Sequence, residues 1–311
     1  AVLTALWLHP PRRGRAPGDR RSLAALDPAG AVLLAAAVVG LMVPFILPGT
    51  WLLLVPAGIL LVLWWLWEAR MRVRSAQTGR APMVDPALFR IPSFSYSTVA
   101  TAFLLGAMPG LWAVQAIVTQ QGLGLSALAA GLTSLPTAVA VMVLSPWIGS
   151  RVHRRGPLFV VLGALLAIAA VGLGMVAFHQ VSVGSWPYWT LAACLFPFGP
   201  AQALLMTSTQ VLTMHEVPLH AAGAAGGVSQ TAQRVMTAIG LAAVTGSFYA
   251  SLAASGADGD RAGAGSAVAV AYGEAADAAL LVVIGLLAVT LLAGVLDYVR
   301  RYRGGTLVLE D

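Results

Sequence analysis

Charge is scarce in this sequence. Only 10% of the 311 residues are charged, whereas 59% are hydrophobic. Soluble domains carry charge on about 25% of their residues, so this composition excludes a water-soluble protein with one core. Lysine is absent, so all eighteen basic residues are arginine, and Cys194 is the single cysteine. One cysteine excludes an internal disulfide, and we expect Cys194 to be a small core residue.

The positions of the charges lead to two further expectations, no nucleic-acid partner and no signal peptide. The net charge of +6 comes from arginines spread over separate segments without interleaved aromatic residues, so we expect no nucleic-acid partner. A signal peptide would place arginines before its apolar run, whereas Val2 to Leu8 precede the first arginine. We interpret residues 1–27 as the tail of an earlier helix and a cytoplasmic loop of a longer protein.

Long apolar runs dominate what remains. A run of about twenty apolar residues spans a bilayer core, and we predict eight such helices, near 28–47, 51–67, 97–118, 127–148, 157–178, 188–212, 222–250 and 277–297. The sequence therefore predicts an all-α polytopic membrane protein whose principal partner is the lipid bilayer.

The arginines predict the topology of these spans. If the N-terminal segment is cytoplasmic, sixteen of the eighteen arginines fall in cytoplasmic segments, Arg261 falls outside and Arg234 lies within a span. This asymmetry is what the positive-inside rule requires. We therefore expect a multi-pass protein of the plasma membrane with both ends of this segment in the cytoplasm.

Several motifs carry a family resemblance. The stretch "GSRVHRRGP" (149–157) resembles the G-x-L-a-D-R-x-G-r loop motif of the major facilitator superfamily, and residues 120–152 are similar to the helix that precedes it. "HAAGAAGGVSQTAQRVMTAIG" (220–240) resembles a helix of the fourteen-helix drug:proton antiporters. Residues 26–34 and 83–95 resemble that family's linking helix and cytoplasmic segment.

The resemblance implies the C-terminal half of a major facilitator fold plus two linking helices, that is, helices seven to fourteen. The expected units are the N-terminal tail and loop at 1–27, two linking helices at 28–67, a cytoplasmic loop at 68–96, a six-helix transporter domain at 97–299 and a cytoplasmic tail at 300–311. A six-helix N-terminal half is then the missing partner.

The function that the resemblance implies is proton-coupled efflux of small amphipathic drugs or metabolites by alternating access. No cofactor is expected, because the proton gradient supplies the energy. A coupling carboxylate should lie within the membrane, but we interpret Asp277 as a helix start and Asp297 as a helix end, so we expect that acid in the missing half. The alternatives are a non-transporting membrane partner and a transporter of another solute. An enzyme is not expected, since no catalytic dyad stands at membrane depth.

The resemblance also nominates a cytoplasmic gate loop, although such loops often fix topology alone. Its residues are Gly149, Arg151, His153, Arg154, Arg155 and Gly156. His153 replaces the aspartate of the family motif, which puts a carboxylate lock in doubt.

Candidate residues for the substrate pathway follow helical spacing or family position, and each has ordinary packing as its alternative. Arg234 lies about 18 Å into its span, a depth at which an arginine is a functional candidate. We predict that Gly223 and Gly227, a G-x-x-x-G pair, pack against a neighbouring helix. The pathway candidates are Trp112, Gln115, Thr119, Gln202, Met206, Gln230 and Arg234.

Overall fold

A computed structural model of the chain describes residues 28–46, 51–78, 86–218, 221–255 and 265–304, and these are helical without a strand. The N-terminal tail and loop at 1–27 lie outside the described residues. The longer helices are α2 (Pro28–Ile46), α3 (Leu54–Thr78), α4 (Pro92–Ile117), α5 (Ala127–Gly149), α6 (Val152–Ser182), α8 (Phe198–His215), α9 (Ala222–Ala254) and α10 (Gly265–Gly304). The short elements are η2 (Trp51–Leu53), η3 (Pro86–Arg90), η4 (Val118–Gly122) and α7 (Thr190–Leu195).

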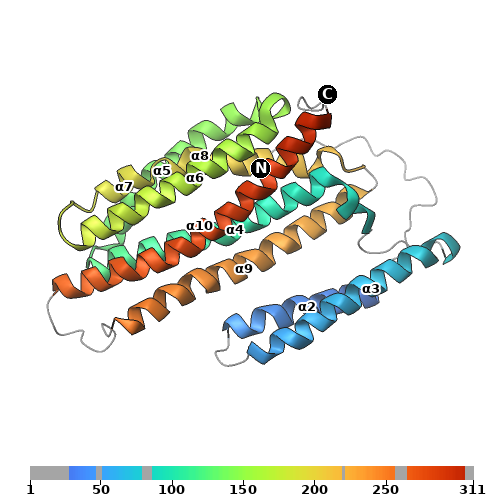
Figure 1. The fold of residues 1–311 in the computed structure, drawn as a ribbon, viewed down its shortest axis with the longest axis horizontal. Coiled ribbons are helices and arrows are strands. Elements are labelled where there is room, and N and C mark those ends of the chain that lie inside the picture. Colours follow the sequence, from blue (N-terminus) through green and yellow to red (C-terminus); the bar gives the residue numbers. More distant parts are fainter. Residues whose placement is uncertain (1–27, 47–50, 79–85, 219–220, 256–264, 305–311) are drawn as a thin grey trace, which may run out of the picture.

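The helices form a bundle with a separate hairpin at its side (Figure 1). Helices α4 to α10 make the bundle, in which α4 packs against α9 and α10, and α6 packs against α8 and α10. The α2–α3 hairpin lies along α9, which it touches through α2. The prediction of an all-α polytopic membrane protein is therefore confirmed.

Six segments of the described chain are long and apolar enough to cross a membrane, and all six belong to the bundle. They are Pro92–Gly122, Ala127–Gly149, Arg155–Ser182, Thr190–His215, Ala222–Ala254 and Ala267–Gly304. The predicted linking pair is helical, as α2 and α3, but is not among these six. That α2 and α3 cross the membrane stays a prediction.

Local sequence signals explain where the helices start. Pro92 opens α4 after the extended residue Ile91. Proline suits this position, because backbone N–H groups in the first turn of a helix have no partner within the helix and the N–H that proline lacks is not needed there. The Ser126 hydroxyl accepts a hydrogen bond from the backbone N–H of Ala129 at 3.2 Å and caps α5. Helix α4 continues through Pro109 without a break and ends in the π-helical turn η4.

Close helix crossings are made by glycines that the motifs did not nominate. At the α4–α9 crossing, a side chain on Gly240 would collide with the backbone of Gly106, and one on Gly110 would meet Val244 at 2.7 Å. Glycine at these positions lets the two backbones approach, the usual device of membrane helix packing.

Helix lengths differ from the prediction at several ends. Helix α3 continues to Thr78, so residues 68–78 are helical and not part of a cytoplasmic loop. Helix α10 begins at Gly265, twelve residues before the predicted start at Asp277, and continues past residue 300 to Gly304. Alanines favour this early start, since they are strong helix formers and Ala269, Ala271 and Ala275 are buried against the bundle.

The sixth predicted span, near 188–212, is interrupted. Helix α7 ends at Leu195 and α8 begins at Phe198, with Pro197 between them. The Thr137 hydroxyl of α5 donates to the carbonyl of Leu195 at 3.3 Å, so a backbone acceptor at the break has a partner. This bond joins α5 to the end of α7, just before α8 begins.

Candidate functional site

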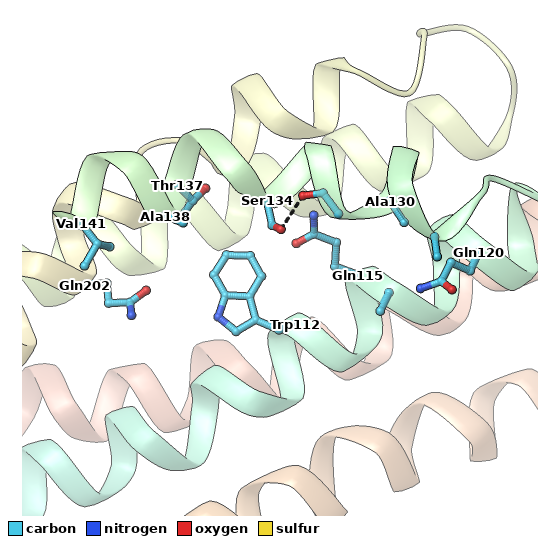
Figure 2. A pocket seen from close by; sticks show the side chains of 12 residues that line it. Trp112, Gln115, Gln120, Ala130, Ser134, Thr137, Ala138, Val141 and Gln202 are labelled. Carbon is cyan, nitrogen blue, oxygen red and sulfur yellow. Dashed lines mark hydrogen bonds between the residues drawn. The ribbon is translucent and has the colours of Figure 1, made fainter. Parts of the chain in front are cut away.

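A cavity of about 480 Å³ lies between α4, α5 and α8 (Figure 2). Its lining residues are Trp112, Gln115, Ala116, Gln120, Ala127, Ala130, Gly131, Ser134, Thr137, Ala138, Val141 and Gln202. A volume in this range is typical of sites for drug-sized molecules. The cavity is therefore the candidate functional site.

Trp112 forms the aromatic wall of the cavity. Its indole packs edge-on against Phe198 of α8, with ring centroids 5.7 Å apart and planes at 86°. Such T-shaped pairs are a favoured aromatic geometry. The pair holds the indole in place, and the indole stays partly exposed. Figure 2 shows it beside Gln115.

Gln115 stands one helical turn from Trp112 and is only 3% exposed. Its Nε2 donates to the Thr133 hydroxyl at 2.7 Å, and that hydroxyl donates to the carbonyl of Ala130 at 2.6 Å. The Thr119 hydroxyl donates to the backbone carbonyl of Gln115 at 2.7 Å. A chain of bonds thus fixes the Gln115 side chain against α5.

The cavity wall carries no formal charge. None of the twelve lining residues is acidic or basic. The Ser134 hydroxyl donates to the Gly131 carbonyl at 2.9 Å, drawn as a dashed line in Figure 2, and the Thr137 hydroxyl donates to Leu195. With these hydroxyl protons already donated, the glutamine amides are the principal polar groups at the wall.

The cavity brings together three of the predicted pathway residues, Trp112, Gln115 and Gln202. Thr119 and Met206 are not at its wall. Thr119 is fully buried, and Met206 packs on the hydrophobic core. The residues of α5 that line the cavity, including Ser134 and Thr137, were not predicted from the sequence. Their signal was there, because alanine, glycine and hydroxyl residues recur along one stretch of α5.

The other two candidates lie on a different surface. Gln230 and Arg234 are exposed on α9 and do not line the cavity. Gly223 and Gly227 are exposed on the same helix, and a side chain added to either would meet nothing within 4 Å. Within the described chain this glycine pair therefore packs against no neighbouring helix, and its role in helix packing stays a prediction. Gly223, Gly227, Gln230 and Arg234 share one face of α9, and this face points outward.

The order of Gln233 and Arg234 along α9 decides which of the two faces the core. Gln233 is 4% exposed and donates from Nε2 to the Ser229 hydroxyl at 3.0 Å, inside the bundle. Consecutive helix residues are about 100° apart, so Arg234 falls on the outer face.

Comparison with known proteins agrees with this architecture. The family model described as Major Facilitator Superfamily matches residues 1–241, more than three quarters of the chain. The chain belongs to the Major Facilitator Superfamily. The resemblance on which the sequence analysis relied is thereby confirmed.

Curated relatives in this superfamily come from mycobacteria. The chain is 29% identical over 169 residues to "Multidrug resistance protein Stp" of Mycobacterium tuberculosis, covering 54% of this chain and 30% of that protein. It is 28% identical over 173 residues to "Multidrug efflux pump LfrA" of Mycolicibacterium smegmatis, covering 55% and 33%. An "Uncharacterized MFS-type transporter Rv1250" of M. tuberculosis is 26% identical over 207 residues, covering 67% and 34%. The chain spans about a third of the length of these relatives.

The superfamily's loop motif is mostly helical here. Only Ser150 and Arg151 separate α5, which ends at Gly149, from α6. His153, Arg154, Arg155 and Gly156 therefore lie in the first turns of α6, and the predicted loop is shorter than its motif. Val152 explains this early start, because its side chain is fully buried against α5 and α8 residues.

The charges of this segment do not form a carboxylate lock within α5 and α6. Arg151 folds back on α5, where its guanidinium stands 4.1 Å from the Trp147 ring centroid and donates to the Trp147 carbonyl at 3.1 Å. His153 and Arg155 are exposed. A side chain on Gly156 would meet Leu212 of α8 at 3.5 Å, so this glycine sits where α6 passes close to α8.

A buried ion-pair cluster lies at the end of the bundle where α6 begins, and the sequence did not predict it. Arg301 of α10 is 2% exposed and donates to Asp297 and to the Ser93 hydroxyl, at 3.0 and 2.6 Å. Glu216, after α8, is 3.0 Å from Arg301 and 3.1 Å from Arg300. Ser93 donates to the Leu212 carbonyl at 2.8 Å. Residues 300–304 are therefore not a tail, because these contacts anchor the end of α10.

Asp277 also differs from the prediction. It lies twelve residues inside α10 and does not mark a helix start. It is half-buried near His179, at the end of α6 that is opposite the Arg301 cluster. An acid is thus present within this span, at its end distant from Asp297.

Proposed function

We propose that this chain is the C-terminal half of an efflux transporter that exports small amphipathic drugs or metabolites by alternating access. The neutral cavity walled by Trp112 and glutamine amides is the observation that carries this proposal. Two of the relatives described above are named as a multidrug resistance protein and a multidrug efflux pump. Drug export by this chain is an inference from those names and from the chemistry of the cavity.

The chemistry of the cavity suits such compounds. Alanine and glycine leave room for a bulky apolar group, the indole offers a flat face, and the amides offer hydrogen bonds without fixing a charge. A few polar groups in a mostly apolar cleft is the usual composition of small-molecule sites.

A six-helix partner is the second part of the proposal. In the apolar stretches of α5 and α9 only 22% of the residues are buried, compared with 61% in the span Pro92–Gly122. Lipid is a poor cover for the outer face of α9, because an arginine at the centre of a span costs about 2.5–3.5 kcal/mol on insertion scales. Arg234 and Gln230 would instead meet the polar interior between two halves.

Proton coupling and orientation complete the proposal. The positive-inside rule puts both ends of this segment in the cytoplasm of a plasma-membrane protein. The shared position of Arg151, Gly156 and the Arg301 cluster at one end of the bundle supports this topology. The proton gradient supplies the energy without a cofactor, and the coupling carboxylate belongs to the missing half.

The test is dye or drug accumulation in cells that carry the complete gene, with and without a protonophore. We expect lower accumulation than in vector-only cells, and loss of that difference when the gradient collapses. Efflux that persists without the gradient would exclude proton coupling. Equal accumulation in both cell lines would overturn the transport function and favour a membrane partner or scaffold.

A further inference from the structure

We propose that Gln115 makes the cavity select aromatic compounds that carry an N–H or O–H donor. This inference deepens the proposed function, since it names the chemical class that the same cavity prefers. It rests on the proposed function only for the transport measurement, because preferential binding can be measured separately.

The orientation of the Gln115 amide is the first step. Thr133 has one hydroxyl proton, and it donates that proton to the Ala130 carbonyl at 2.6 Å. The same hydroxyl oxygen can then only accept, and it accepts from Nε2 of Gln115 at 2.7 Å. Turning the amide around would place two acceptor oxygens against each other. The nitrogen is therefore held on α5.

The second step concerns the amide oxygen of Gln115, Oε1. With Nε2 on Thr133, Oε1 has no hydrogen-bond partner among the described residues, and it is buried. Figure 2 shows this oxygen on the Trp112 side of the amide, where the Ser134 side chain of α5 also lies, with the nitrogen pointing away from Trp112. A buried acceptor without a partner is unfavourable, so a donor supplied by a bound molecule relieves it.

Trp112 defines the rest of the preferred compound. It lies three residues before Gln115, so both side chains project from the same side of α4. Its ring is fixed by Phe198, and flat aromatic molecules pack well against such a wall. A compound that pairs an aromatic ring with an N–H or O–H group satisfies both residues at once. A compound without that donor leaves Oε1 unpaired.

Two phenothiazinium dyes test this preference. Thionine carries two exocyclic NH₂ groups, and methylene blue carries dimethylamino groups on the same cationic ring and no N–H, so only thionine offers a donor. Binding of each dye to the purified complete protein would be measured by fluorescence anisotropy, and efflux would be measured in cells. We expect Gln115→Leu to weaken thionine binding about three- to tenfold, the value of one hydrogen bond, and to change methylene blue binding less than twofold.

Variants of Thr133 separate positioning from packing. Thr133→Val removes the hydroxyl that anchors the Gln115 amide while keeping the shape of the side chain, so it should reduce the preference for thionine. Thr133→Ser keeps the hydroxyl and should retain it. Gln120→Leu is the matched control, because Gln120 also lines the cavity but is exposed, and it should affect both dyes equally.

The outcomes distinguish this inference from the proposed function. If Gln115→Leu weakens both dyes equally, or if the purified protein binds neither, donor selection is wrong. If binding shows the predicted preference but cells export neither dye, the inference stands and efflux fails. If cells export both dyes and the Gln115 variants do not discriminate between them, efflux stands and the inference fails.

Discussion

At the scale of single residues, the cavity depends on side chains whose neighbours fix them. Trp112 is held by Phe198 and Gln115 by Thr133. The helical spacing of Trp112 and Gln115 placed both on one face in the sequence. Their partners come from α8 and α5, which the sequence could not align with α4, since side-chain contacts between helices depend on how those helices pack.

Trp112 is expected to supply aromatic packing to bound compounds. The Trp112→Phe variant keeps a ring beside Phe198 but shortens the wall, so we expect a loss of about 0.5–1.5 kcal/mol in binding of aromatic dyes. Dye titration of the purified complete protein measures it. Trp189→Phe is the control, because Trp189 is 61% exposed and does not line the cavity. Equal losses in both variants would remove Trp112 from the binding wall.

At the scale of helices, the α4–α9 crossing depends on Gly240. The Gly240→Ala variant places a methyl group against the backbone of Gly106, and overpacking of this kind costs about 1–3 kcal/mol. Thermal unfolding in detergent should show a lower Tm. Gly246→Ala on the same helix meets nothing within 4 Å and should leave Tm unchanged or slightly raised. A Tm for Gly240→Ala equal to that of wild type would show that the crossing is looser.

The Arg301 cluster joins the ends of α4, α8 and α10. The Arg301→Gln variant removes one of the two ion pairs of the buried Asp297 and leaves it paired with Arg300 alone. Breaking a buried pair costs up to about 3–5 kcal/mol. We expect a marked loss of Tm, whereas Arg303→Gln should have little effect because Arg303 is exposed. Similar Tm values for the two variants would mean that the cluster contributes nothing to stability.

At the scale of the whole molecule, the exposed face of α9 should contact the N-terminal half. We expect the Gly227→Cys variant, made in a Cys194→Ser background, to form cross-links with cysteines introduced into the upstream helices of the complete protein. Leu281→Cys is the control, because Leu281 is 60% exposed on α10 and we expect lipid there. Cross-linking from both positions, or from neither, would contradict this arrangement.

The sequence alone determined the class of the molecule and the approximate position of each helix. Apolar runs of bilayer length leave backbone groups without water, and a helix satisfies those groups within one segment. Local patterns therefore sufficed for the six membrane-length helices. Helix ends were less certain, because the early start of α10 depends on alanines that become buried only when the bundle forms.

Only the tertiary structure decided which polar residues act together. Arg234 and Gln233 differ by one position, yet one faces outward and the other is buried. Arg301 belonged to a predicted tail, and its partners Ser93 and Glu216 are far away in sequence. Hydrogen bonds and ion pairs act over a few ångströms. Residues distant in the chain come within that range only through the packing of the helices.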